Sequence, residues 1–152
     1  MTDDDQRIHP PARLRALASW QTGKVSALGA RLTAPRMPLG GRADFAVLAA
    51  LDEYGSLSQA ELGRRLGLDR NDVNAILNRL QPRHHVDRQP DPEDRRRNVV
   101  TLTEAGRRHL DELQAHADAV QEELLKGLDA DERLQLQALL AKLLSSHQPQ
   151  PA

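Results

Sequence analysis

LSQAELGRRLGLDRNDVNAILNRL, residues 57–80, carries two helix starts in close succession. Ser58 stands three residues before Glu61, which is the spacing of a capping box at the start of a helix. Asp69 can cap a second helix in the same way, with Asp72 in the first turn where a negative charge suits the helix dipole. The stretch therefore predicts a helix-turn-helix, two short helices joined by a tight turn at Gly67.

A basic hairpin is predicted directly after these helices. Residues 86–89 and 98–102 have strand-like composition, and residues 90–97, PDPEDRRR, are turn-rich and end in three arginines. A capped helix, a turn, a polar-faced helix, a basic hairpin and a long helix follow one another in a winged helix-turn-helix. This order predicts a mostly helical α+β fold with a small β-hairpin wing.

The second helix of the motif has two distinct faces. Helical geometry turns its apolar positions, Val73, Ile76, Leu77 and Leu80, to one side and Asn71, Asn74, Ala75 and Asn78 to the other. Asparagine is a poor helix former, so three of them cost roughly 1 kcal/mol relative to better formers. An asparagine amide can pair with adenine in the major groove, which favours a base-reading face over a merely solvated one.

Helices are predicted on both sides of the motif. Apolar spacing indicates one helix from Ala12 to just before Pro35, a second over residues 42–54, a long one from Thr103, and a last one capped by Asp129. Residues 1–11 are polar and predict a flexible arm, and residues 148–152 predict a disordered tail. Residues 12–147 are expected to form one domain.

At several places the sequence resembles the MarR family of transcription regulators. The similarity is carried by LSQAEL at 57–62, LGLDR at 66–70, Arg79-Leu80, DPEDRR at 91–96 and LTEAG at 102–106, and it spans about residues 42–110. It implies a homodimeric transcriptional repressor that binds a palindromic operator in double-stranded DNA. It also implies that helices in 12–54 and 104–147 form the dimer and that residues 55–103 are the winged helix-turn-helix. It also implies that Asp94 holds the wing and that Arg96 enters the minor groove. The resemblance and the polar helix face together predict these DNA-binding residues: Ser58, Gln59, Arg70, Asn71, Asn74, Asn78, Arg79, Asp94, Arg95, Arg96 and Arg97.

The chain departs from the family pattern between the motif and the wing. Where relatives usually have glycine, this sequence has His84-His85. Glycine commonly supplies a left-handed turn, and histidine tolerates positive φ better than most residues. The turn is therefore expected to survive.

Small molecules and metals give weaker signals. The resemblance implies that a small aromatic or phenolic anion releases the protein from DNA. Trp20 and Lys24, one helical turn apart, could offer such an anion a flat wall and a cation. Packing in the dimer is the alternative role for Trp20. His84 with His85, or His109 and His116 with Glu112, were considered as metal ligands. Neither group is a full set at tight spacing, so no metal and no cofactor is predicted.

Composition excludes other classes of protein. The chain has no cysteine, no apolar run of membrane-spanning length and no glycine-rich phosphate loop or nucleophile motif, so we expect a soluble cytoplasmic protein that is not an enzyme. Net charge is −1, but residues 58–108 hold 11 basic and 8 acidic groups (+3) and residues 109–152 hold 3 and 8 (−5). The remaining alternative is a winged helix that binds proteins instead of DNA.

Overall fold

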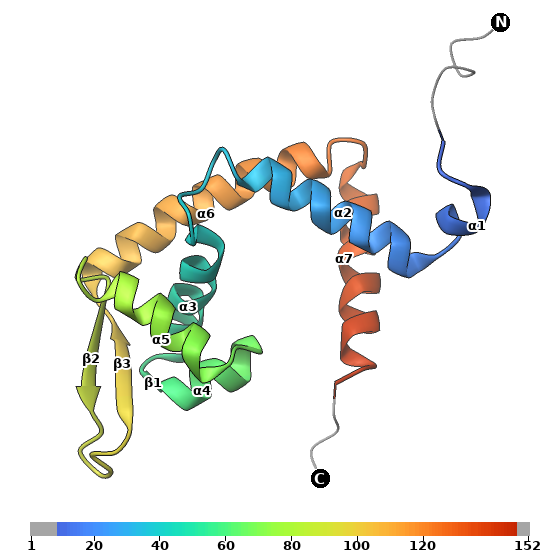
Figure 1. Ribbon diagram of the computed structural model, residues 1–152. Coiled ribbons are helices and arrows are strands. Elements are labelled where there is room, and N and C mark those ends of the chain that lie inside the picture. The colour runs from blue at the N-terminus through green and yellow to red at the C-terminus, as the bar shows by residue number, and fades with distance from the viewer. Residues whose placement is uncertain (1–8, 149–152) are drawn as a thin grey trace, which may run out of the picture. The chain divides into compact units, whose positions relative to one another are not determined.

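The computed structural model describes residues 9–148 (Figure 1). Most of the predicted tail, residues 148–152, and most of the predicted arm, residues 1–11, lie outside this range. The elements are α1 (Ala12–Arg15), α2 (Ala18–Thr33), α3 (Gly41–Tyr54), β1 (Leu57–Ser58), α4 (Gln59–Leu66), α5 (Arg70–Leu80), β2 (Val86–Pro90), β3 (Asn98–Leu102), α6 (Glu104–Leu124) and α7 (Ala130–Ser145). The predicted class, mostly helical with a small antiparallel sheet, is confirmed.

The chain divides into two compact units. A central unit comprises Thr33–Ala119, and a terminal unit comprises the described residues up to Leu32 and from Val120 onward. This differs from the predicted division, which grouped residues 12–54 and 104–147 as dimerisation helices. Helix α3 belongs to the central unit because Val47, Leu48 and Leu51 are buried in the same cluster as the helix-turn-helix.

The core of the central unit is built from aliphatic side chains that the sequence pattern aligns. Leu48, Leu62, Leu77 and Leu80 are fully buried, and Val100 of β3 joins them from the sheet. All four inward positions predicted on the second motif helix are buried in α5. Burying each such side chain contributes about 1.5–3 kcal/mol, so this core fixes α4 and α5 against α3 and the sheet.

The sheet has three strands rather than the two predicted. Their order is β1-β3-β2, with both pairs antiparallel. Leu57 pairs with Val100 and Ser58 with Val99, while β2 and β3 form the hairpin from Val86↔Leu102 to Pro90↔Asn98. Strand β1 is two residues long and runs straight into the capping box, so no alternation in the sequence reveals it. Figure 1 shows the hairpin projecting from the helices of the central unit.

The base of this hairpin is a crowded junction. His84 adopts the left-handed conformation expected at this point, with φ 58°. Its neighbour His85 accepts a hydrogen bond at its backbone oxygen from the Thr103 nitrogen at 3.2 Å. A Cβ atom on Gly106 would lie 1.9 Å from that same oxygen, so α6 can start here only because residue 106 is glycine.

The first predicted helix is interrupted in the terminal unit. The Leu17 nitrogen bonds the Leu14 oxygen at 3.0 Å, a tight i→i−3 turn that ends α1. The side chain of Gln21 donates to the Arg15 oxygen at 2.7 Å and so satisfies a carbonyl freed by the break. Helix α7 begins as predicted, with a capping box between Asp129 and Glu132. None of the described helices is long and apolar enough to cross a membrane.

Candidate nucleic-acid interface

Helix α5 presents the predicted polar face. The Asp69 carboxylate accepts a hydrogen bond from the Asp72 nitrogen at 2.8 Å and starts the helix. Since the apolar side of α5 is buried in the core, Asn71 and Asn78 are exposed and Asn74 is half-buried. The face therefore exists, but its three asparagines have different surroundings.

Ser58 positions α4 through its hydrogen bonds with Glu61. Its hydroxyl accepts from the Glu61 nitrogen at 3.2 Å and donates to the Glu61 carboxylate at 2.9 Å. The backbone nitrogen of Ser58 donates to the same carboxylate at 2.9 Å, and these bonds hold the pKa of Glu61 below its usual range. The serine is buried and caps α4, and its predicted contact with DNA stays a prediction.

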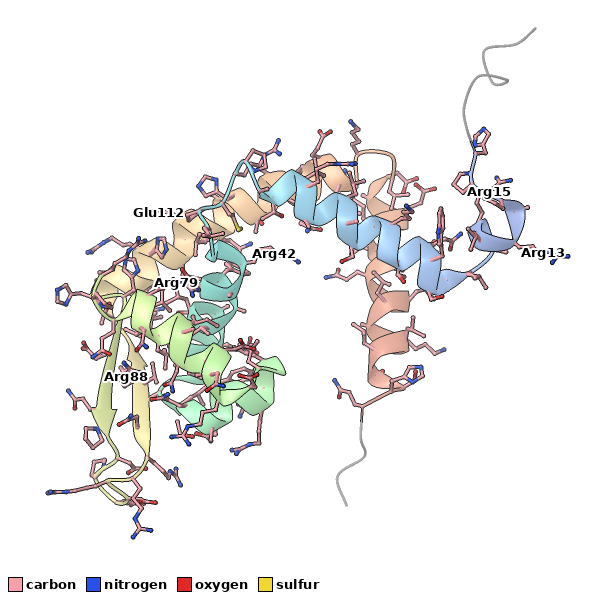
Figure 2. The ribbon with its side chains drawn as sticks, in the orientation of Figure 1. Arg13, Arg15, Arg42, Arg79, Arg88 and Glu112 are labelled. Atoms are coloured by element: carbon pink, nitrogen blue, oxygen red, sulfur yellow. The ribbon has the colours of Figure 1, made fainter. Side chains whose placement is uncertain are left out.

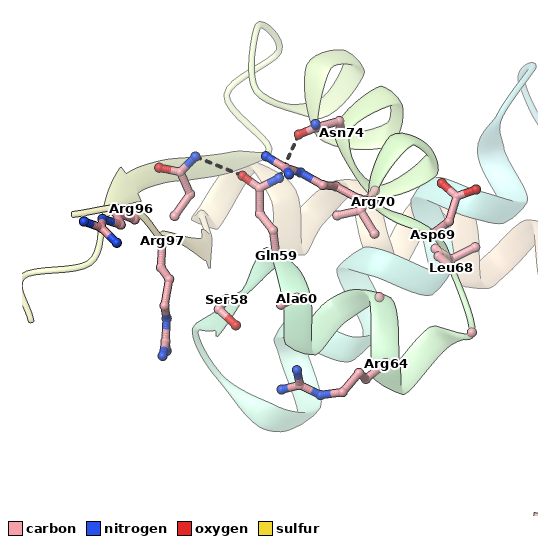
Figure 3. A pocket seen from close by; sticks show the side chains of 14 residues that line it. Ser58, Gln59, Ala60, Arg64, Leu68, Asp69, Arg70, Asn74, Arg96 and Arg97 are labelled. Carbon is pink, nitrogen blue, oxygen red and sulfur yellow. Dashed lines mark hydrogen bonds between the residues drawn. The ribbon is translucent and has the colours of Figure 1, made fainter. Parts of the chain in front are cut away.

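An open cleft of about 940 Å³ lies where α4, α5 and β3 meet (Figure 3). Of the predicted residues, it brings together Ser58, Gln59, Arg70, Asn74, Arg96 and Arg97. Its lining contains four arginines, Arg64 among them, and one carboxylate. That carboxylate belongs to Asp69, which caps α5. The cleft is therefore electropositive and suits a polyanion.

Amide side chains connect the three elements across this cleft. Gln59 of α4 donates through Nε2 to Oδ1 of Asn74 at 2.8 Å. Asn98 of β3 donates through Nδ2 to Oε1 of Gln59 at 3.1 Å, and Figure 3 draws both bonds. The polar face of α5 is thus tied to the wing through α4.

The wing tip is shaped by its own carboxylates. Asp94 accepts a hydrogen bond from the Arg96 nitrogen at 3.0 Å. Asp91 accepts from the Glu93 nitrogen at 2.9 Å and forms an ion pair with Arg97 at 3.5 Å. These bonds fix the turn while leaving Arg95 and Arg96 exposed.

Five predicted residues do not line the cleft: Asn71, Asn78, Arg79, Asp94 and Arg95. Arg79, labelled in Figure 2, donates to Asp44 of α3 at 2.7 Å, and the aspartate side chain is 8% exposed. Asn78 accepts from Arg88 of β2 at 2.9 Å. Arg79 thus ties α5 to α3, because a nearly buried carboxylate needs its charge partner, and its predicted contact with DNA stays a prediction.

Among the cleft residues that the sequence prediction left out, Arg64 and Asn98 add donor groups to the site. Arg64 lies one turn beyond Ala60, which also lines the cleft, so helical spacing from Ala60 could have found it. Asn98 had no such signal, because it meets Gln59 through the pairing of Ser58 with Val99, which follows from the unpredicted β1.

The residues predicted to bind a small molecule, and the histidines weighed as metal ligands, do not line the cleft. Lys24 Nζ is 5.3 Å from the centre of the Trp20 ring in the terminal unit. His85 and His109 stack with ring centres 4.3 Å apart, and burial lowers the pKa of His85, as do the charges of His109 and Arg83. Among residues 9–148 no three histidine or carboxylate side chains converge as a metal site.

The fold and the cleft together define a winged helix-turn-helix protein of the DNA-binding kind. A profile of the MarR family matches residues 41–97. The chain is 38% identical over 102 residues to the transcriptional repressor NicR of Pseudomonas putida, covering 67% of this chain and 65%, slightly under two thirds, of NicR. It is 33% identical over 101 residues to the multiple antibiotic resistance protein MarR of Salmonella typhimurium, covering 66% of this chain and 70% of that protein. This chain belongs to the MarR family.

Solved structures agree with this assignment. Bordetella bronchiseptica BpsR, in a structure concerning regulation of its DNA binding by 6-hydroxynicotinic acid, matches with TM-score 0.73 and 27% identity over 82% of this chain and 96% of BpsR. A mutant MarR of E. coli in complex with operator DNA matches with TM-score 0.66 and 28% identity over 88% of this chain and 94% of that one. The family consists of transcription regulators, so the chain stands among DNA-binding proteins and not among enzymes.

Proposed function

We propose that this protein is a sequence-specific repressor that binds double-stranded DNA in the cytoplasm. The observation that carries the proposal is the electropositive cleft, in which Gln59, Asn74 and Arg96 come from three different elements. The likeness to a MarR protein in complex with operator DNA supports the class of ligand, and the similarity to the transcriptional repressor NicR supports repression.

The contacts follow from the geometry of the two grooves. Helix α5 presents Asn71 and Asn74 to base edges in the major groove, where amides can read hydrogen-bonding patterns. The wing carries Arg96 into the minor groove, where negative potential attracts arginine. Phosphate contacts from Arg64, Arg70, Arg95 and Arg97 hold the protein on the duplex without reading sequence.

The operator is a palindrome read by a homodimer. Helix α7 buries none of its residues within the chain, and five of its six leucines are 39–69% exposed. A second copy that covers these leucines would bury a large apolar surface and place two reading units about one helical turn of DNA apart.

Selection of random duplex DNA at about 150 mM salt tests the proposal, since screening suppresses non-specific binding. We expect enrichment of a two-fold palindrome. Arg96→Ala should weaken binding to it by about 1–3 kcal/mol with the dimer intact. Arg108→Ala is the matched control, because Arg108 lies outside the cleft and is exposed on α6. A library without an enriched motif would instead support a protein-binding winged helix.

A small aromatic carboxylate or phenolic anion is the proposed releasing ligand. The support is the BpsR structure, which concerns regulation by 6-hydroxynicotinic acid, together with the Trp20–Lys24 pair. Since Trp20 is the sole tryptophan of the chain, its fluorescence reports on this place alone. Titration with 6-hydroxynicotinic acid should quench it and release DNA, and Lys24→Gln should weaken both effects. Release without any quenching would place the ligand elsewhere.

A further inference from the structure

The three amides in the cleft form a chain with one direction. Asn98 donates to Gln59, and Gln59 donates to Asn74. Each amide has one donor group and one acceptor group, so fixing the first bond fixes the orientation of every member. The chain therefore ends at Asn74 with its Nδ2 donor and at Asn98 with its Oδ1 acceptor.

The donor end is the one on the reading helix. Oδ1 of Asn74 already accepts a hydrogen bond from Gln59 at 2.8 Å, and within the described residues its Nδ2 donates to no other side chain. Pairing with adenine uses both the oxygen and the nitrogen of an asparagine, whereas guanine offers two acceptors, N7 and O6, in the major groove. An Asn74 held in this way suits guanine better than the adenine suggested by sequence alone.

We infer that Gln59 and Asn98 are positioning residues that set the base preference of Asn74, favouring guanine at its site. The inference rests on the proposed function and assigns specificity to a wing residue that itself reads no base at that position. Its structural basis is the pairing of β1 with β3, because Ser58 opposite Val99 places Gln59 beside Asn98. The wing and the reading helix therefore act on one base pair.

Asn98→Asp gives the sharpest test, because a carboxylate can only accept. Gln59 must then turn to donate to the new carboxylate, and its oxygen faces Asn74. Asn74 turns in response and presents Oδ1 to the groove, which suits the amino groups of cytosine and adenine. The preference at that base pair should shift from guanine to cytosine or adenine by about tenfold, within the range measured for one good base contact.

The experiment compares base profiles selected from a random duplex library by full-length variants. Asn74→Ala should flatten one position of the motif and so identify the base pair that Asn74 reads. Asn98→Asp should reverse the preference at that position. Gln89→Asp, on the neighbouring strand β2 and exposed, adds the same charge outside the cleft and should leave the profile unchanged.

The outcomes separate this inference from the proposed function. If the wild-type protein selects no motif, the proposed function fails and the inference falls with it. If a motif appears and Asn74→Ala flattens one position, but Asn98→Asp leaves that position unchanged or acts like Gln89→Asp, the inference is overturned and the DNA-binding function stands. Reversal at the Asn74 position alone supports both.

Discussion

Of the fifteen apolar residues that are buried among the described residues, fourteen lie in the central unit and only Val120 lies in the terminal unit. In the central unit, α5 has four fully or nearly buried residues and α3 has six. In the terminal unit, α7 has none. Of the ten large apolar side chains that are exposed among the described residues, eight lie in the terminal unit: Leu14, Leu17, Val25, Leu134, Leu139, Leu140, Leu143 and Leu144.

Local signals do not explain this contrast, because both units have them. Asp69 caps α5 and Asp129 caps α7 with the same side-chain bond to the third helical residue. The units differ in what their apolar faces meet. A leucine face that stays in water gains none of the burial energy that stabilises a helix, so the terminal unit needs a surface that one chain does not supply. This is the physical argument for the proposed dimer.

The largest expected effect is a disruption of the central unit at Gly106. Gly106→Ala would place a Cβ atom 1.9 Å from the His85 backbone oxygen and 2.8 Å from Leu102. The His85 oxygen belongs to the backbone and cannot turn aside as the Leu102 side chain can, so α6 must shift, at a cost of about 3 kcal/mol or more. Chemical denaturation should show this loss of stability.

Gly23→Ala is the control in the terminal unit. Nothing lies within 4 Å of a Cβ at Gly23 in α2, so alanine should stabilise this helix by about 0.5–1 kcal/mol. Equal effects of the two substitutions would mean that the junction at Gly106 is looser than the structure indicates.

The next largest expected effect is the loss of self-association caused by a charge on α7. Leu139 is 66% exposed, so Leu139→Glu would be nearly neutral in an isolated chain. In a dimer that covers this face it would bury a carboxylate, and we expect self-association to weaken by roughly 100-fold, about 2.8 kcal/mol. Sedimentation over a range of concentrations measures this change.

Leu39 supplies the matched substitution in the central unit. It is 100% exposed in the loop before α3, and Leu39→Glu should leave the sedimentation profile unchanged. If Leu39→Glu dissociates the protein and Leu139→Glu does not, the dimer interface lies on the central unit and not on the leucine face of α7.

The same contrast explains which features could be predicted from sequence. The capped starts of α4, α5 and α7 and the buried stripe of α5 depend on residues within one turn or two of each other, and these were predicted correctly. The amide chain and the Arg79–Asp44 ion pair were missed because they join residues 15 to 39 positions apart. The break between α1 and α2 was missed because the apolar spacing continues through it. The break is visible only in the hydrogen bonds of Leu17 and Gln21, which depart from the α-helical pattern.

Helix caps give a smaller and more symmetrical test. Asp69→Ala and Asp129→Ala each remove an N-cap, which costs about 1 kcal/mol. In the central unit the loss should fray the start of α5 and weaken DNA binding about fivefold, with self-association unchanged. In the terminal unit the loss should weaken self-association by a similar factor and leave the DNA affinity of the assembled dimer unchanged. Each variant is the control for the other, and an effect of Asp69→Ala on self-association would argue against separate roles.

The smallest effect concerns pH and the stacked histidines of the central unit. The His85 pKa is lowered by burial and by the positive charges of His109 and Arg83, which outweigh the opposing effect of Asp44 and Glu112. The unfolded chain therefore takes up a proton near pH 6.5, while the folded chain resists it until lower pH. Stability linked to His85 is fully present above that value and is lost as pH falls through the lowered folded pKa.

His85→Gln should flatten the loss of unfolding free energy between about pH 7.5 and 5.5. The Nδ1 atom of His85 is buried without a hydrogen-bond partner, so the neutral ring is what the stack accommodates. Parallel curves for the variant and the wild type would mean that the stack opens at little cost and that the wing junction tolerates a charged ring.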